Sequence, residues 1–296
     1  SAPAELVMAE GDAAGHPGKH LPEWKCVYRD GRLTGSWSNA GKTKVYRIRL
    51  KENYSGGAHA FSVSRYQHTF DAFPGVDSTP QFRITVAFPV AGQQLEAAGW
   101  LNNRVKEVMA QDTSLSFDEG LKRNLEEIVE AYRSGLKNEK DGPFRASMNN
   151  ETIAIASVNY NEHDYVVIRS DLYTYTGGVH GVREASYTCY DVQRRKELEL
   201  NGIVSAGPAT LQRLIEKQFR KDNGLQPSDT LTAILFKNKL PPNDNFYFND
   251  KGLGFSYNPY EVAAYATGII DVLIPYRDLK KYLVPAFRQR MKIKVD

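Results

Sequence analysis

The sequence has few of the features that mark several protein classes. Only two of its 296 residues are cysteine, too few for a disulfide framework and wrongly spaced for a zinc site. Cys26 and Cys189 could form one long-range bridge or stay two buried free thiols, and both alternatives remain open. No apolar run is long enough to span a bilayer. The longest apolar-leaning stretch, residues 263–274, is interrupted by Gly268 and Asp271.

An excess of charge of one sign is also missing. The formal net charge is +3, whereas binding to nucleic acid usually requires a concentrated basic face. The basic cluster at residues 288–294 is more typical of a solvated tail or a closing strand than of a polyanion site. No glycine-rich phosphate loop follows a strand, so a nucleotide-binding fold has no support. With 41% hydrophobic and 25% charged residues, the composition is that of a soluble globular protein.

The first 22 residues show no hydrophobic periodicity and are rich in Ala, Gly, Pro and His, which predicts a flexible lead at 1–22. There is no initiator Met and no signal-like segment, so we expect a chain trimmed after a signal or lipoprotein sequence. His16 and His20 have the i, i+4 spacing of a helical metal pair. Their Gly- and Pro-rich surroundings disfavour a helix, and we predict no metal site and no cofactor.

Alternating apolar and polar residues predict strands, and apolar residues at three- to four-residue steps predict helices. We expect strands at 44–50, 58–70, 81–88, 152–160, 165–175, 184–190, 246–248, 253–257 and 268–274. We expect helices at 93–110, 118–137 and 208–220, with a short one starting near Asp278. Strands and helices come in blocks, which predicts an α+β fold with mostly antiparallel sheets and about three helices. Its two parts are predicted at residues 23–140 and 141–296.

The most distinctive segment is Tyr175-Thr-Gly-Gly-Val-His180. Gly177 and Gly178 allow positive φ and close chain approach, as a tight turn or a bulge requires. His180 can bond a backbone carbonyl through one ring nitrogen and another group through the other. A structural role is favoured over catalysis, since no acid or nucleophile lies beside the motif in the sequence.

A near copy of this segment, Tyr54-Ser-Gly-Gly-Ala-His59, lies 121 residues upstream, and Tyr66 matches Tyr187 at the same offset. The near copy suggests two related hairpin units, with chance similarity and local turn chemistry as the alternative. Whether the two turns build one surface is left open by the sequence.

Tyrosines are dense over residues 257–265. Amphipathic rings on a loop suit recognition of a protein or a glycan, whereas the alternative is that they brace the core, with Asn258-Pro259 as a simple turn. The candidate binding residues are Tyr54, His59, Tyr175, Gly177, Gly178, His180, Tyr257, Asn258, Pro259, Tyr260 and Tyr265.

An ordered set of rare runs carries a family resemblance. Its parts are residues 171–181, 187–191, 196–200, 245–268 and 272–279. This set resembles the C-terminal domain of the RsiV/PdaC-like extracytoplasmic family. In that family a Tyr-Thr-Gly-Gly-Ala-His turn follows a strand, and an Asn-Phe-Tyr hairpin leads into a Tyr-x-Pro-Tyr-Glu-Ile-Ala-x-Tyr-Ala-x-Gly signature. The resemblance covers roughly residues 80–287, with a divergent PdaC-like part upstream.

The resemblance implies an exported bacterial module, periplasmic or lipid-anchored, that faces the cell envelope. In RsiV the extracytoplasmic part recognises lysozyme, and in PdaC the module accompanies a separate deacetylase domain. We therefore expect a binding module for a lysozyme-like protein or a peptidoglycan-related glycan, and not an enzyme or a nucleic-acid-binding protein. Thr69-Phe70-Asp71 is similar to a deacetylase strand end, but Ala72 stands where such enzymes have a second aspartate.

The alternative function is a polysaccharide or cell-wall hydrolase, or a deacetylase-associated enzyme. It would use His180 or His59 with a carboxylate such as Asp171, Glu184 or Asp191, and glycoside hydrolysis needs two carboxylates at a defined separation. A structural envelope protein without a ligand is a third possibility.

Overall fold

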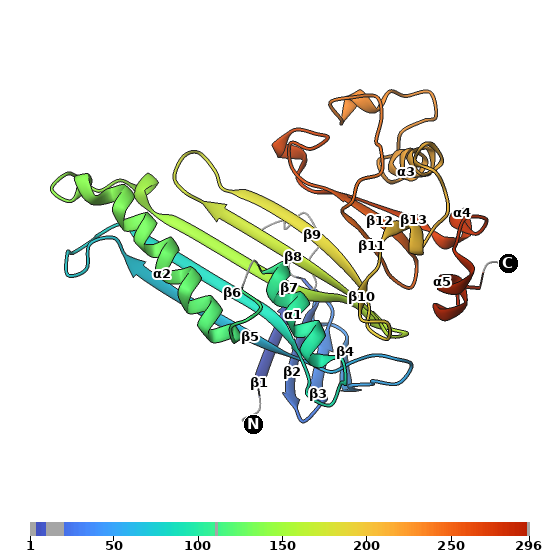
Figure 1. The fold of residues 1–296 in the computed structure, drawn as a ribbon, viewed down its shortest axis with the longest axis horizontal. Coiled ribbons are helices and arrows are strands. Elements are labelled where there is room, and N and C mark those ends of the chain that lie inside the picture. The colour runs from blue at the N-terminus through green and yellow to red at the C-terminus, as the bar shows by residue number, and fades with distance from the viewer. Residues whose placement is uncertain (1–3, 10–20, 110–111, 295–296) are drawn as a thin grey trace. The chain divides into compact units, whose positions relative to one another are not determined.

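A computed structural model describes residues 4–9, 21–109 and 112–294 of the chain (Figure 1). The chain divides into two compact units, unit 1 (Ser1–Ser55) and unit 2 (Gly56–Asp296). This division differs from the boundary predicted near residue 140. The reason is that strands on the two sides of residue 140 pair directly within one sheet of unit 2.

Unit 1 is a four-stranded antiparallel sheet in the order β1-β2-β3-β4. Its strands are β1 Ala4–Ala9, β2 Glu23–Arg29, β3 Arg32–Ser38 and β4 Val45–Lys51. The register places Leu6, Cys26, Gly35 and Ile48 opposite one another across the sheet, and the apolar side chains of all four strands share this face.

Two expectations for unit 1 need correction. Residues 4–9 form β1 instead of a flexible lead, because their alternation matches the apolar face of β2. No strand was expected before residue 44, yet β2 and β3 precede it. Residues 10–20, with His16 and His20, lie outside the described residues. Cys26 in unit 1 and Cys189 in unit 2 are both buried free thiols in the structure.

Unit 2 is built on a six-stranded sheet in the order β10-β9-β8-β7-β6-β5. Its strands are β5 Phe61–Asp71, β6 Gln81–Ala91, β7 Asn150–Glu162, β8 Tyr165–Tyr175, β9 Val182–Asp191 and β10 Lys196–Glu197. The β6–β7 pair is parallel and the others are antiparallel.

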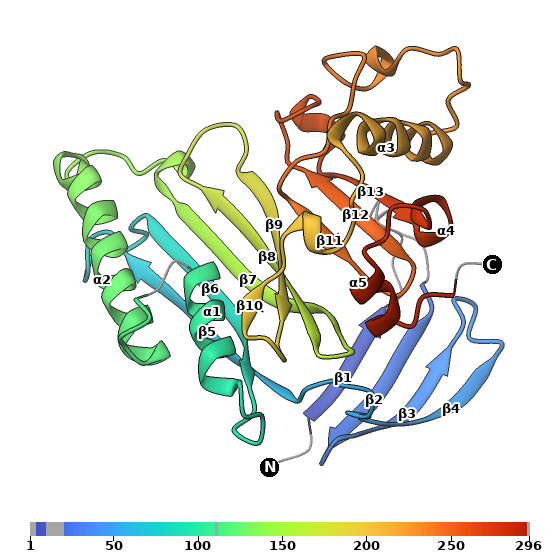
Figure 2. The ribbon, with the colours of Figure 1, turned by 45° about the vertical axis from the view of Figure 1, so that its right-hand side comes forward.

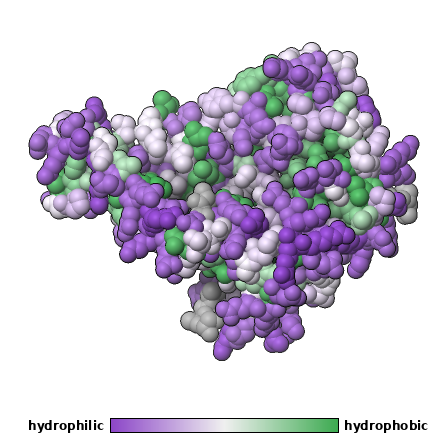
Figure 3. All heavy atoms as spheres, viewed as in Figure 1, coloured by the Kyte–Doolittle hydropathy of each residue, from purple (hydrophilic) through white to green (hydrophobic). Residues whose placement is uncertain are grey.

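A parallel pair requires a long crossover connection. The segment between β6 and β7 supplies it with two helices, α1 (Ala98–Val108) and α2 (Phe117–Leu136). Both lie on one face of the sheet, in front of it in Figure 1. Ser116 and Glu119 form a capping box that starts α2, which satisfies amide groups that the first turn leaves unpaired. In the space-filling view, hydrophilic side chains predominate at the α2 end of this face, with hydrophobic ones among them (Figure 3).

The remaining elements pack against the other face of β8 and β9. They are α3 Pro208–Asp222, β11 Phe246–Phe248, β12 Gly252–Tyr257, β13 Ile270–Pro275, α4 Tyr276–Leu279 and α5 Pro285–Arg290. The last three strands form an antiparallel sheet, seen beside α3 in Figure 2.

Strand β8 lies between two hydrophobic cores. Its even-numbered Val166 and Ile168 pack with α1 and α2, whereas its odd-numbered Tyr165 and Val167 pack with the three-stranded sheet. The predicted α+β class, with mostly antiparallel sheets, three longer helices and a two-part architecture, is confirmed. No helix of the described residues is long and apolar enough to cross a membrane.

Candidate functional site

The distinctive glycine segment forms the turn between β8 and β9. Gly177 and Gly178 have φ of +91° and +96°, a region that favours glycine. A Cβ on Gly177 would lie 2.4 Å from the carbonyl oxygen of Ser147, whereas a Cβ on Gly178 would meet nothing within 4 Å. Tyr175 is half-buried and its hydroxyl donates to the Gly178 carbonyl at 3.1 Å. The two glycines are therefore required by the backbone, as expected.

His180 is exposed and its ring is held in place from two sides. Its Nδ1 lies 3.0 Å from the carbonyl oxygen of Gly181, which can only accept, so Nδ1 carries the proton. The ring stacks on Tyr265 with centroids 4.0 Å apart and an interplanar angle of 17°. The Tyr265 hydroxyl donates to the same Gly181 carbonyl at 2.6 Å. The turn and the distant segment around Tyr265 thus meet at one place.

Tyr260 extends this aromatic stack. Its ring centroid lies 5.7 Å from that of Tyr265, and 58% of its surface is exposed. Its φ of +70° is a conformation that bulky side chains rarely adopt. Val179, in the neighbouring turn, is 98% exposed. We call Val179, His180, Tyr260 and Tyr265 the tip surface.

Two asparagines attach the Tyr260 segment to the edge of β9. The Asn258 side chain accepts from the backbone N–H of Ala185 at 2.8 Å and donates to the Ala185 carbonyl at 3.1 Å. Asn245 donates to the same carbonyl and accepts from the N–H of Tyr187. The amide side chains take the place of a neighbouring strand, so the Tyr260 loop is held firmly against the sheet.

The other tyrosine-rich positions have different surroundings. Tyr257 is buried and its hydroxyl donates to the Pro241 carbonyl at 2.7 Å, so it braces the core. Pro259 is half-buried. The dense tyrosines were the sequence signal for a binding surface in this segment. Asn245 and Asn258 were not recognised as the residues that hold that surface in place.

The near copy of the glycine motif lies at the opposite end of β8. The backbone carbonyls of Gly56 and Gly57 accept hydrogen bonds from the backbone N–H groups of His163 and Asp164, both at 2.8 Å. His163 and Asp164 form the β7–β8 turn. Since β8 has 11 residues, the two turns are separated by roughly 35 Å at about 3.3 Å per residue. The two turns therefore do not build one surface, which answers the question that the sequence left open.

Tyr54, the first residue of the near copy, belongs to unit 1. Its hydroxyl and that of Tyr28 donate to the two carboxylate oxygens of Glu52, at 2.7 and 2.6 Å. Burial and the carboxylate raise the pKa of Tyr54 to about 12. This arrangement stabilises the sheet of unit 1.

His59 is packed against the β7–β8 turn. Its Nε2 lies 3.5 Å from Asp164 Oδ1, and its side chain is 11% exposed. Burial lowers the pKa of His59, an effect that the nearby Asp164 carboxylate only partly offsets. The folded protein therefore favours the neutral form of His59 more than the unfolded chain does.

The depressed pKa predicts a dependence of stability on pH. As the pH falls below about 6.5, the unfolded chain protonates His59 before the folded chain does. The stability that the neutral ring contributes is therefore present above that pH and is lost below it. We expect the free energy of unfolding to fall between about pH 7 and pH 5, and this slope to flatten in His59→Gln. Denaturant unfolding of the parent and of His59→Gln at the two pH values measures this change in free energy. An equal change in both proteins would contradict the lowered pKa of His59.

The carboxylates considered for hydrolysis do not gather around either histidine. Asp171 is held in a bidentate pair by Arg169, at 2.7 and 2.8 Å. Asp191 is fully buried and paired with Arg290 at 2.8 Å, and Glu184 is exposed. Among the described residues, no group of His, Cys, Asp and Glu side chains is arranged to hold a metal ion.

The fold and the tip surface together define an α+β module in which a shared sheet separates two cores and presents an aromatic loop surface. Residues 201–277, which include α3 and the three-stranded sheet, match the family of proteins of unknown function DUF3298. The chain therefore contains a DUF3298 domain.

Two solved structures have a similar fold. A DUF3298-family member from Bacteroides fragilis is 23% identical with a TM-score of 0.69, covering 80% of this chain and all of its own. A DUF3298-family protein from Pseudomonas aeruginosa is 17% identical with a TM-score of 0.55, covering 78% of this chain and 98% of its own. No curated protein matches the chain significantly. The narrower RsiV/PdaC-like resemblance stays a prediction.

Proposed function

We propose that this chain is an extracytoplasmic binding module that recognises a partner protein through the tip surface. The observation that carries the proposal is the exposed stack of His180, Tyr265 and Tyr260 beside the almost fully exposed Val179. Tyrosines that present a large amphipathic surface are enriched among the residues that dominate binding energy.

The stack is already ordered before any partner arrives. Hydrogen bonds to the Gly181 carbonyl fix His180 and Tyr265, and Asn258 fixes the segment that carries Tyr260. Fewer rotamers are then lost on association, which favours affinity. The strained φ of Tyr260 also supports a binding role, because such strain persists where the surroundings impose it and often accompanies function.

The place of action and the partner class rest on the family resemblance. It favours the bacterial cell envelope, periplasmic or lipid-anchored, and a lysozyme-like protein as partner. A peptidoglycan-related glycan is the rival ligand. We favour a protein because Val179 and Tyr260 are exposed apolar side chains, suited to insertion into the concave surface of a partner.

The proposal is tested by measuring binding of the purified chain to lysozymes and, separately, to soluble peptidoglycan fragments. Tyr260→Gly removes the ring and relieves the positive φ. We expect it to weaken binding at least about tenfold while leaving stability equal or about 1 kcal/mol higher. The matched control is Ile128→Ser, which removes a 45% exposed apolar side chain from α2.

Four outcomes decide between the alternatives. Binding to lysozyme that falls in Tyr260→Gly and not in Ile128→Ser supports the proposal. Binding to glycan fragments alone would replace the protein partner by a glycan, and release of smaller fragments would favour the hydrolase. The absence of binding to both probes would contradict a binding role of this kind.

A further inference from the structure

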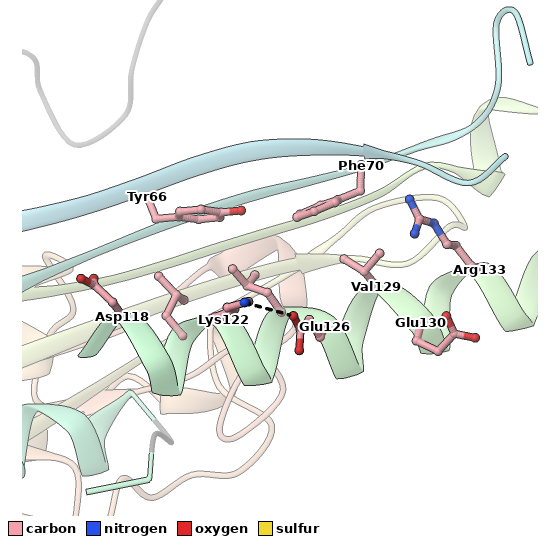
Figure 4. A pocket seen from close by; sticks show the side chains of 10 residues that line it. Tyr66, Phe70, Asp118, Lys122, Glu126, Val129, Glu130 and Arg133 are labelled. Atoms are coloured by element: carbon pink, nitrogen blue, oxygen red, sulfur yellow. Dashed lines mark ion pairs between the residues drawn. The ribbon is translucent and has the colours of Figure 1, made fainter. Parts of the chain in front are cut away.

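A groove runs between the edge strand β5 and helix α2, on the helix-bearing side of the sheet. Its volume is about 650 Å³. Tyr66 and Phe70 of β5 face Val129 of α2 across it (Figure 4), and Leu125 also lines it. Charged side chains of α2 line it on the solvent side, from Asp118 at one end to Arg133 at the other. The groove is apolar within and charged at its rim.

Strand β5 is the last strand of its sheet, so one side of it is unpaired within that sheet. Gly92 donates to the Ala60 carbonyl and Ala72 donates to the Pro80 carbonyl. With the register of β5 and β6, the even-numbered residues of β5 therefore bond to β6, and the odd-numbered ones direct N–H and C=O outward. Arg133 Nε donates to the outward carbonyl of Asp71 at 3.0 Å, in agreement with this assignment.

The open edge has little of the usual protection against pairing. Natural edge strands are kept short or carry charged residues, above all lysine, proline or a bulge. The 11 residues of β5 contain no lysine and no proline, and its charged residues, Arg65 and Asp71, lie away from His68. Its register with β6 is continuous. His68 lies between Tyr66 and Phe70 on the groove side, with ring centroids 4.5 Å from Phe70. A long, regular strand with an aromatic row is suited to pairing with another strand.

We propose that a second copy of this chain pairs with β5, about a two-fold axis perpendicular to the sheet and centred on His68. The two β5 strands then run antiparallel and the sheets join edge to edge. Gln67 and Thr69 of the second copy exchange two backbone hydrogen bonds, and Tyr66 packs directly opposite Phe70 of the second copy. Closely spaced aromatic pairs of this kind stabilise antiparallel strands.

Two charge pairs along α2 match this symmetry, and they favour a second copy over an unrelated peptide. Glu126, which lies near the axis, is paired with Lys122 of its own helix at 3.9 Å. The same axis sets the two α2 helices antiparallel, since Tyr66 lies towards the Asp118 end of the groove and Phe70 towards the Arg133 end. Asp118 then lies opposite Arg133 of the second copy, and Lys122 lies opposite Glu130. The midpoint of each pair along α2 lies near residues 125–126. One two-fold axis therefore brings opposite charges together in both pairs. A self-complementary patch is what a two-fold interface requires.

The first test is the mass of the full chain in solution, measured by sedimentation over a wide range of concentration. We expect the 33.3 kDa monomer to be replaced by a particle of twice that mass as concentration rises. Gln67→Pro removes an outward N–H without touching the bonds to β6, and proline is tolerated at such edge positions. By symmetry two backbone bonds are lost, so the dimer is expected to weaken at least about tenfold. Gln67→Val keeps the N–H and is the matched control.

The second test uses charge reversal and does not alter the strand. Lys122 is 78% exposed in its side chain, so Lys122→Glu leaves the fold intact and is expected to weaken the dimer. Adding Glu130→Lys restores an opposite-charge pair and is expected to restore the dimer. A chain that stays monomeric at every concentration would overturn the proposal. A dimer indifferent to Gln67→Pro and to charge reversal would overturn it too, because its interface would then lie elsewhere.

Discussion

Replacing Arg290 with methionine is expected to lower the free energy of unfolding by about 3–5 kcal/mol. Asp191, its partner, has no exposed surface. Arg290 Nη1 donates to Asp191 Oδ2 at 2.8 Å, and burying a carboxylate without such a partner is costly. Arg194 also contacts this carboxylate, but its side chain is 58% exposed and its Nη1 lies 3.3 Å away.

Arg290 has three further contacts that methionine cannot replace. Its Nε donates to the His163 carbonyl at 2.9 Å and its Nη2 to the Asp164 carbonyl at 3.1 Å. Its guanidinium lies 4.1 Å from the ring centroid of Tyr165, close enough for a cation–π interaction. The side chain thus fastens α5 to the β7–β8 turn. Its loss removes the Nε donor of the His163 carbonyl and leaves Arg194 as the cationic partner of the buried carboxylate.

The matched control is Arg194→Met, which removes the exposed partner of the same carboxylate. It is expected to cost less than about 1 kcal/mol, as is usual for exposed ion pairs. Denaturant unfolding of the two variants beside the parent measures the difference. Equal losses, or a loss below about 1 kcal/mol for Arg290→Met, would show that Asp191 does not depend on Arg290.

Much of the sheet in unit 2 was predictable from local sequence pattern. The strand expected at 165–175 is β8, with the same bounds, because its β-branched and aromatic run ends at clear turns. The helix expected at 118–137 is α2 within one residue at each end. Periodicity reports how a segment presents its own side chains, and it therefore predicts the elements well.

Pairing between distant segments was not predictable in the same way. The parallel contact of β6 with β7 joins residues on either side of two helices, and nothing in either strand identifies its neighbour. Because β6 and β7 pair, the domain boundary expected near residue 140 falls between two neighbouring strands of one sheet. Strands β2 and β3 were missed because Val27 breaks the alternation of apolar and polar residues in β2, and Gly35 breaks it in β3.

The candidate site shows the same limit at the level of single residues. Tyr257, Tyr260 and Tyr265 have identical side chains within nine residues, yet one is buried, one is exposed and one is stacked on His180. These differences arise from Asn258, which binds the edge of β9 and turns the chain around it. That contact spans 73 residues of sequence, so it could not be derived from the segment itself.

Replacing Gly177 with alanine is expected to lower the free energy of unfolding by about 3 kcal/mol or more. Two costs add at this position. The φ of +91° is unfavourable for any residue with a Cβ, by about 1–2 kcal/mol. The new methyl group would also lie 2.4 Å from the Ser147 carbonyl oxygen. This contact is with backbone, so it is relieved only by moving the turn or the chain beneath it.

Gly178 provides a control one residue away in the same turn. Its φ of +96° is nearly the same, but a Cβ there would meet nothing within 4 Å. Gly178→Ala is therefore expected to carry only the backbone cost, about 1–2 kcal/mol. The difference between the two variants isolates the contact with Ser147. Denaturant unfolding measures both, and equal losses would mean that the turn does not rest on Ser147.

The same pair of variants tests whether the glycine motif is needed for folding alone or also for partner binding. Any shift of the turn at Gly177 moves His180, and with it the stack on Tyr265 that orders the tip surface. Gly177→Ala is therefore expected to weaken partner binding as well as folding, whereas Gly178→Ala leaves the stack in place and should bind nearly as the parent does. Normal binding by a folded Gly177→Ala variant would mean that the geometry of this turn is not needed for recognition. On this account the glycines position the site, and the rings of His180, Tyr260 and Tyr265 make the contact.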